Sequence, residues 1–213
     1  MKKVLVMLLM FGATAGYAQD QQEIINRLTP VCHGIDSTKS IESWKSKLAI
    51  IQAVQAANGD NWIPAYYNAY VSIQLSYSET NTEIRELYVD AAEGLMPQIE
   101  AGCKLMDEIH IMKALIANAR MAIDPQNRWK EYGKIFDENL AKAKTINENN
   151  PHIYLLKAMS VYYTPKMFGG GAKNAKPYFI KANDKFALLT NKSIETPYWG
   201  EFLSAFMLAE CEK

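Results

Sequence analysis

One short motif recurs along the chain at an almost constant spacing. In each copy a bulky apolar residue lies three positions before an alanine, and another directly follows that alanine. The copies are Tyr66–Tyr70, Ile111–Leu115, Leu155–Met159 and Phe202–Phe206, built around Ala69, Ala114, Ala158 and Ala205. Successive alanines are 45, 44 and 47 residues apart. This period predicts a helical solenoid in which each alanine lets two helices approach closely. The alternative is chance recurrence in an alanine-rich helical chain.

Other signals also favour an all-α fold. Asp124-Pro125, Asn150-Pro151 and Thr196-Pro197 each place a capping residue before a proline suited to a first helical turn. Residues 71–77 alternate and could form a strand, but helical spacing on both sides predicts a helix. The expected helices outside the motifs lie near 20–28, 40–57, 82–101, 127–147 and 172–189. The helix near 40–57 pairs with one at 61–79, and a last unit near 198–212 has no second helix.

The N-terminus is typical of a secretory signal peptide. Lys2 and Lys3 precede an apolar run at 4–11, and small residues follow at 12–18. We expect cleavage after Ala18 rather than Ala15, which removes residues 1–18 and leaves 19–213 as a single domain. The run is too short to cross a bilayer, so no membrane span is expected. The protein is therefore predicted to be exported, either to the periplasm of a Gram-negative-type bacterium or outside the cell. The alternative is a buried N-terminal helix.

Charge and cysteine content narrow the function classes. The chain has 23 basic and 23 acidic residues, whereas a nucleic-acid-binding protein shows a basic excess or stripe. We therefore expect no nucleic-acid partner. Cys32, Cys103 and Cys211 allow at most one internal disulfide, and the sequence does not say which pair would form it. Three packed thiols are the alternative.

Gly169–Gly171, followed by Lys173, looks like part of a phosphate-binding loop. That loop requires Ser or Thr directly after the lysine and a strand before the glycines. Asn174 follows the lysine, and no strand is expected here. We therefore expect a flexible turn between paired helices, with Asn174 capping the second one.

No residues form a recognisable catalytic or metal-binding pattern. His33, His110 and His152 have no ligand pattern at three or four residues' distance. Asp107 and Glu108, near His110, are expected to form an exposed first helical turn. No serine nucleophile elbow is present. We predict no metal, no cofactor and no enzymatic activity.

The third unit carries the most specific similarity to a known family. Ala158 occupies the small position of a first helix, and the second helix contains Ala175-x-x-x-Phe179-x-x-Ala182. With the turn at 147–151, this pattern resembles the tetratricopeptide repeat (TPR). The resemblance implies a right-handed superhelical array of antiparallel helix pairs, a TPR-like α-solenoid of about three to four units.

The resemblance covers residues 61–212, but its specific motifs lie only in 147–182. The repeat here is about 45 residues, longer than the family's usual repeat. An insertion at Thr164–Gly171 also resembles exported TPR-like proteins, including periplasmic partners of TRAP-type solute transporters. That second comparison depends on one loop.

The TPR resemblance implies a partner-binding surface, because first helices line the concave face of such arrays. This face would be apolar and aromatic, formed by Tyr66, Tyr70, Ile111, Leu115, Leu155, Met159, Tyr162, Tyr163, Trp199, Phe202 and Phe206. We predict a non-enzymatic scaffold module that binds a protein or peptide segment here. One alternative is a carrier for an apolar small ligand. Another is that these residues meet as ordinary core.

Overall fold

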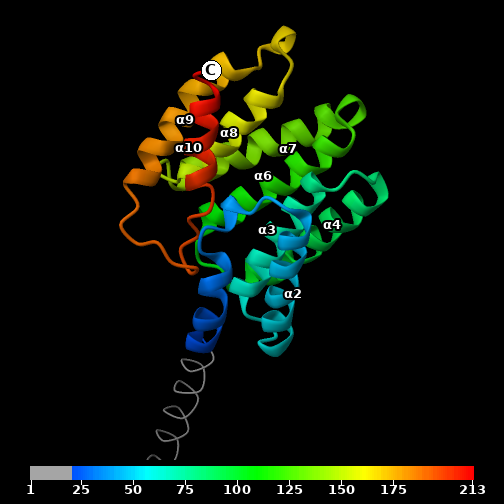
Figure 1. The fold of residues 1–213 in the computed structure, drawn as a ribbon, viewed down its shortest axis with the longest axis vertical. Helices are drawn as coiled ribbons and strands as arrows, with labels where there is room; N and C mark the ends of the chain where they lie inside the picture. The colour runs from blue at the N-terminus through cyan, green and yellow to red at the C-terminus, as the bar shows by residue number, and fades with distance from the viewer. Residues whose placement is uncertain (1–20) are drawn as a thin grey trace, which may run out of the picture.

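The computed structural model describes residues 21–213, and helices form almost all of their regular structure (Figure 1). The predicted signal peptide lies outside the described residues. After a helical segment at 21–32, the elements are η1 (Ile35–Ser37), α2 (Ile41–Ala57), α3 (Trp62–Ser78), α4 (Thr82–Gly94), α5 (Met96–Gly102), α6 (Met106–Ile123), α7 (Pro125–Ile146), α8 (Pro151–Tyr163), η2 (Lys166–Phe168), α9 (Ala172–Ala187) and α10 (Glu201–Glu210). Within 21–213, β structure is limited to an isolated bridge between Ser193 and Thr196. The all-α prediction is confirmed, and residues 71–77 lie inside α3.

Side-chain caps explain where several helices begin. Asp124 accepts a hydrogen bond from the Asn127 amide at 3.3 Å, and α7 starts at the following proline. Asn150 accepts from the His152 amide at 2.9 Å, and α8 starts in the same way. Each cap satisfies an amide that has no partner within its own helix. Both cap predictions are therefore confirmed.

Two other predicted caps are wrong. Thr196 bonds to Ser193 in a tight turn, and α10 begins only after Gly200. The side-chain amide of Asn174 donates to the carbonyl oxygens of the glycine turn instead of capping, and α9 begins after Gly171. In both places local hydrogen bonding of a short polar side chain competes with the cap.

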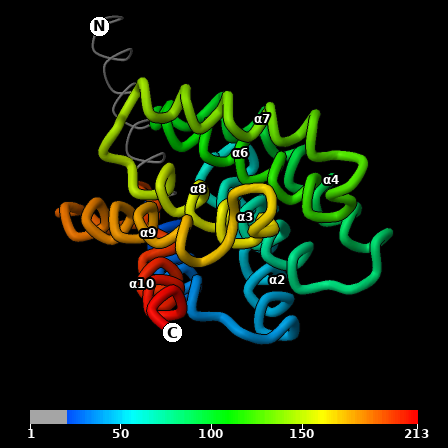
Figure 2. Tube along the Cα trace, turned by 90° about the horizontal axis from the view of Figure 1, so that it is seen from above, coloured from blue at the N-terminus to red at the C-terminus, as the bar shows by residue number. Residues whose placement is uncertain are grey.

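Helices that follow one another in the chain pack as neighbours. The closest pairings are α6 with α7, α8 with α9, and α3 with both α2 and α4 (Figures 1 and 2). The second helix expected at 82–101 is divided into α4 and α5 at Leu95. One hydrophobic cluster runs through the packed helices. The right-handed superhelical order remains a prediction.

The repeated alanines do not share one environment. Ala69, Ala114 and Ala158 are completely buried between helices, whereas Ala205 is exposed. α10 packs through its opposite face, which contains Ser204 and Met207, mainly against α9. The motif therefore marks close helix packing in its first three copies only.

We expect Ala158→Leu to destabilise the protein by about 1–3 kcal/mol, because the larger side chain has no space between packed helices. Ala205→Leu is the matched control and should change stability by less than about 0.5 kcal/mol, because that alanine faces solvent. Urea unfolding followed by circular dichroism measures both changes. Equal effects of the two substitutions would contradict the packing role of the alanine.

Candidate functional site

Most of the predicted partner-binding face is closed. Six of its eleven residues are buried in the core: Tyr66, Tyr70, Ile111, Leu115, Leu155 and Trp199. Met159 and Tyr162 are partly buried, and only Tyr163, Phe202 and Phe206 are exposed. These six residues therefore form core, and no partner can reach them without a rearrangement.

The chain after α9 closes this face by folding back over the first helices. The indole of Trp199 stacks on the imidazole of His152, with ring centroids 3.9 Å apart, and packs on Tyr70 at 4.6 Å. These contacts join residues 47 and 129 positions apart in the chain. The sequence pattern of separate helices contains no signal for this long-range contact.

A buried carboxylate, Glu108, forms the centre of the polar contacts beneath this segment. One of its oxygens accepts a hydrogen bond from the Tyr66 hydroxyl at 2.6 Å. The other contacts the Asn150 side-chain amide at 2.6 Å and Nδ1 of His152 at 2.8 Å. The expectation of an exposed Asp107-Glu108 turn is therefore wrong, since both acids are buried and each contacts Asn150. A buried carboxylate is tolerated only with such partners.

The same cluster also fixes the C-terminal segment. Nε2 of His152 lies 2.8 Å from the Trp199 carbonyl oxygen, and the Trp199 indole donates to the Tyr66 hydroxyl at 2.9 Å. The two ring nitrogens of His152 therefore contact oxygens on two different elements, the Glu108 carboxyl of α6 and the Trp199 carbonyl before α10. Burial, reinforced by Glu108, raises the pKa of Tyr66, so its hydroxyl stays a donor.

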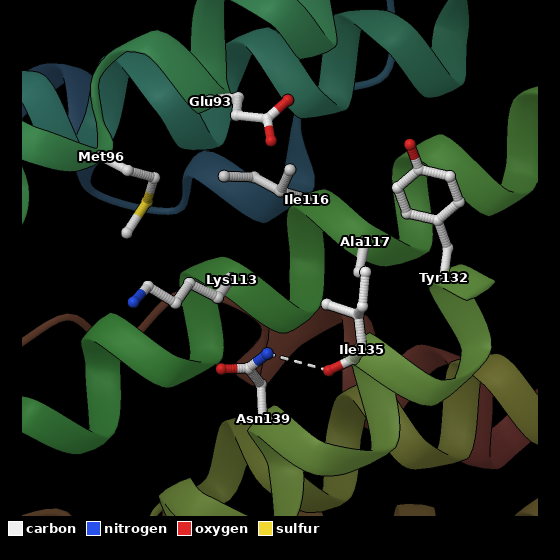
Figure 3. A pocket seen from close by; sticks show the side chains of 8 residues that line it. All are labelled: Glu93, Met96, Lys113, Ile116, Ala117, Tyr132, Ile135 and Asn139. Atoms are coloured by element: carbon white, nitrogen blue, oxygen red, sulfur yellow. Dashed lines mark hydrogen bonds between the residues drawn. The ribbon is translucent and has the colours of Figure 1, made fainter.

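A separate opening is lined by residues of α4 to α7. It is a cleft of about 270 Å³ between α4–α5, α6 and α7, here called the α6–α7 cleft (Figure 3). Its lining is mainly apolar, with Glu93, Lys113 and Asn139 as the polar members; the others are Met96, Ile116, Ala117, Tyr132 and Ile135. An apolar cleft with few polar groups is typical of small-molecule sites.

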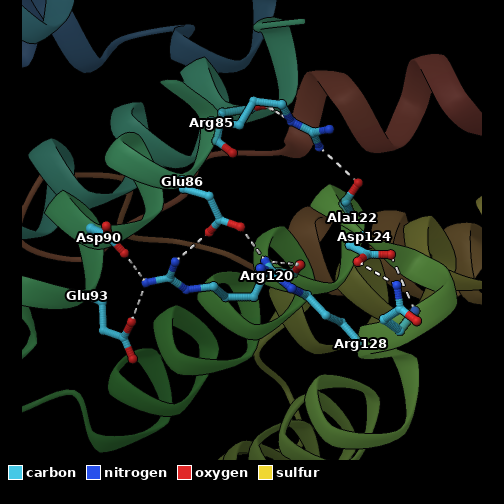
Figure 4. A network of polar contacts seen from close by, with 10 residues as sticks. Arg85, Glu86, Asp90, Glu93, Arg120, Ala122, Asp124 and Arg128 are labelled. Atoms are coloured by element: carbon cyan, nitrogen blue, oxygen red, sulfur yellow. Dashed lines mark hydrogen bonds and ion pairs between the residues drawn. The ribbon is translucent and has the colours of Figure 1, made fainter. Parts of the chain in front are cut away.

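The charged groups at this cleft are paired with protein partners. Arg120 binds Glu93 and Glu86 at 2.7 Å each and also contacts Asp90 (Figure 4). Partial burial lowers the pKa of Arg120, but the hydrogen bonds that it donates to these three carboxylates raise it by more. Lys113 forms a 2.7 Å ion pair with Glu100. Pairing leaves the apolar side chains as the main surface offered to a ligand.

A second cleft of about 180 Å³ lies between α7, α8 and α9. Tyr154 and Tyr178 give it aromatic surface, and Lys144 and Lys157 give it positive charge. Asp137 pairs with Lys157 at 2.9 Å. α7 therefore separates two clefts, a larger apolar one and a smaller one that carries more charge.

The described residues contain neither a metal-binding cluster nor a disulfide. Within 21–213 no group of three or more His, Cys, Asp or Glu side chains is placed to hold a metal ion. All three cysteines are free thiols. Burial raises the pKa of Cys32 to about 12 and that of Cys103 to about 11, so both stay protonated. No helix in the described part of the chain is long and apolar enough to span a membrane.

Comparison with known proteins places this arrangement in a family. No protein-family model and no curated protein matches the sequence. A solved structure, the HusA haemophore from Porphyromonas gingivalis, matches with a TM-score of 0.72 and 30% sequence identity. The match covers 90% of this chain and 92% of the haemophore. The chain belongs to the family of this haemophore. The TPR resemblance remains a prediction.

We expect Tyr66→Phe to destabilise the protein by about 1–3 kcal/mol, because it removes a donor from buried Glu108 and an acceptor from the Trp199 indole. Tyr67→Phe is the control, since Tyr67 is equally buried and this change removes no hydrogen bond between described residues. Chemical denaturation followed by Trp fluorescence measures both. A smaller effect for Tyr66→Phe than for Tyr67→Phe would contradict the role of the cluster.

Proposed function

We propose that the protein is a non-enzymatic, exported carrier of a planar, largely apolar ligand of the porphyrin class, with haem as the representative. The observation that carries this proposal is the match to the HusA haemophore along nine-tenths of both chains. The match has a TM-score of 0.72 and 30% identity, so the two chains share their helical arrangement along most of their length. It favours the carrier alternative over the scaffold module. The scaffold prediction now depends on the five predicted residues that stay accessible.

The α6–α7 cleft is the site that fits this ligand best. Its floor consists of buried apolar side chains of α5 and α6, and Tyr132 and Ile135 of α7 form one wall. At about 270 Å³ the cleft is just below the roughly 300–1,000 Å³ of sites that enclose a drug-sized ligand. A porphyrin therefore lies partly outside the cleft, with its apolar plane against this wall.

The charges at the cleft are compatible with the carboxylates at the edge of such a ligand. Arg120 contacts Glu93 and reduces its repulsion of an anion, although Arg120 is shared with Glu86 and Asp90. Lys113, whose side chain is 38% exposed, can exchange its partner Glu100 for a ligand carboxylate. A lysine in this position acts as a point charge on a flexible stem.

The test is a titration of the purified protein with haemin, followed by the Soret absorbance and by Trp fluorescence. We expect Ile135→Glu to weaken binding by at least about ten-fold, because it places a charge against the apolar plane of the ligand. Ile50→Glu, on α2 and of similar exposure, is the control and should change affinity by less than about two-fold.

A parallel titration with metal-free protoporphyrin separates recognition of the ring from recognition of the iron. Recognition by the apolar wall and Lys113 predicts affinities for the two ligands within about ten-fold, which is about 1.4 kcal/mol. Haemin binding that Ile135→Glu leaves unchanged would refute the assignment of the cleft. Absence of any spectral change in the unaltered protein would refute the carrier function itself.

A further inference from the structure

The segment between α8 and α9 carries the three most exposed large apolar side chains in residues 21–213. The exposed fractions are 83% for Met167, 73% for Phe168 and 71% for Tyr163. The segment, here called the tip loop (residues 163–171), forms the top of the molecule in Figure 1, beyond the ends of the neighbouring helices. Exposed apolar side chains gathered in one place are typical of an interaction surface.

The backbone holds these side chains outward in a fixed turn. A Cβ on Gly170 would lie 1.9 Å from the Thr164 carbonyl oxygen, so only glycine fits there. Gly169 has a φ of 84°, which other residues rarely adopt. The Asn174 side-chain amide donates to the carbonyl oxygens of both glycines, at 3.0 and 3.2 Å. The tip loop is therefore organised before any partner binds, which lowers the entropy cost of binding.

The chain on both sides of the tip loop is rich in lysine. Residues 149–183 contain five lysines and no acidic residue, in a chain that has equal numbers of both charges. Two of these lysines pair with acids elsewhere in the fold. Lys166 and Lys173, within and next to the tip loop, are exposed and form no ion pair among the described residues. Positive charge therefore stays available beside the apolar side chains.

From this combination we infer that the tip loop docks the protein onto an anionic lipid surface. Met and Phe side chains bury favourably at the boundary of headgroups and acyl chains, and tyrosine is favoured at the interface. Lysines near an anionic membrane are attracted to its surface charge. The tip is a projection, and a projection of this kind enters a deformable surface without a preformed pocket. The inference is independent of the ligand proposed for the α6–α7 cleft.

The test is co-sedimentation of the purified protein with vesicles of phosphatidylcholine containing about one quarter phosphatidylglycerol. We expect binding to these vesicles and little binding to pure phosphatidylcholine. The double variant Met167→Ser with Phe168→Ser should reduce the bound fraction at least about five-fold. Lys166→Glu with Lys173→Glu should do the same, and about 0.5 M salt should weaken binding of the unaltered protein.

Leu87→Ser with Leu188→Ser is the matched control, because these side chains are 66% and 64% exposed and lie outside the tip loop. We expect this variant to bind the anionic vesicles as the unaltered protein does. Equal losses in this control and in the tip-loop variant would overturn the inference, as would no vesicle binding by the unaltered protein. Equal binding to the anionic vesicles and to pure phosphatidylcholine vesicles would also overturn it. Circular dichroism of each variant verifies that the fold is kept.

Discussion

The fold depends on the need to satisfy one buried carboxylate. Glu108 lies at the start of α6, away from water, where an unpaired charge would cost several kcal/mol. Its hydrogen-bond partners come from α3, from α8 and from the turn before α8. Two of these partners, His152 and Tyr66, also form hydrogen bonds with Trp199. One acidic side chain thus fixes the relative positions of three helices and the C-terminal segment. Any rearrangement that opened the first-helix face would have to break these hydrogen bonds together.

This constraint explains why ligand binding is assigned to a different surface from the one the sequence predicted. The predicted groove contains Tyr66 and Trp199, which are members of the buried cluster. Their aromatic surface is used in packing, so it is not offered to a partner. The α6–α7 cleft lies instead between helices joined by ion pairs of Arg120 at its edge. Such partly exposed pairs separate at less cost than a buried cluster does, because water replaces them.

The sequence predicted what depends on local patterns and missed what depends on distant contacts. Helical spacing and the caps at Asp124 and Asn150 gave the helix order with ends close to those observed. The repeated alanines correctly predicted close helix packing in three of the four copies, because a small residue is by itself a signal of close approach. The exposure of Ala205 depends on which face of α10 packs against α9, and the failure of Thr196 to cap a helix depends on its turn with Ser193. Both features follow from tertiary contacts that a local sequence pattern does not contain.

The cleft was missed for a related reason. Tyr132 and Ile135 have the spacing of ordinary core positions on an amphipathic helix, and only the offset between α5, α6 and α7 leaves them at a surface. The tip loop differs, because its glycines, lysines and apolar residues are adjacent in the chain and can be identified from the sequence alone. What the structure adds is direction: the glycine turn points Met167 and Phe168 into solvent. Met167 and Phe168 bury little surface in the isolated chain, so their rigid presentation favours a partner surface. A lipid interface next to exposed lysines supplies such a surface, and it leaves the α6–α7 cleft on other helices free for a ligand.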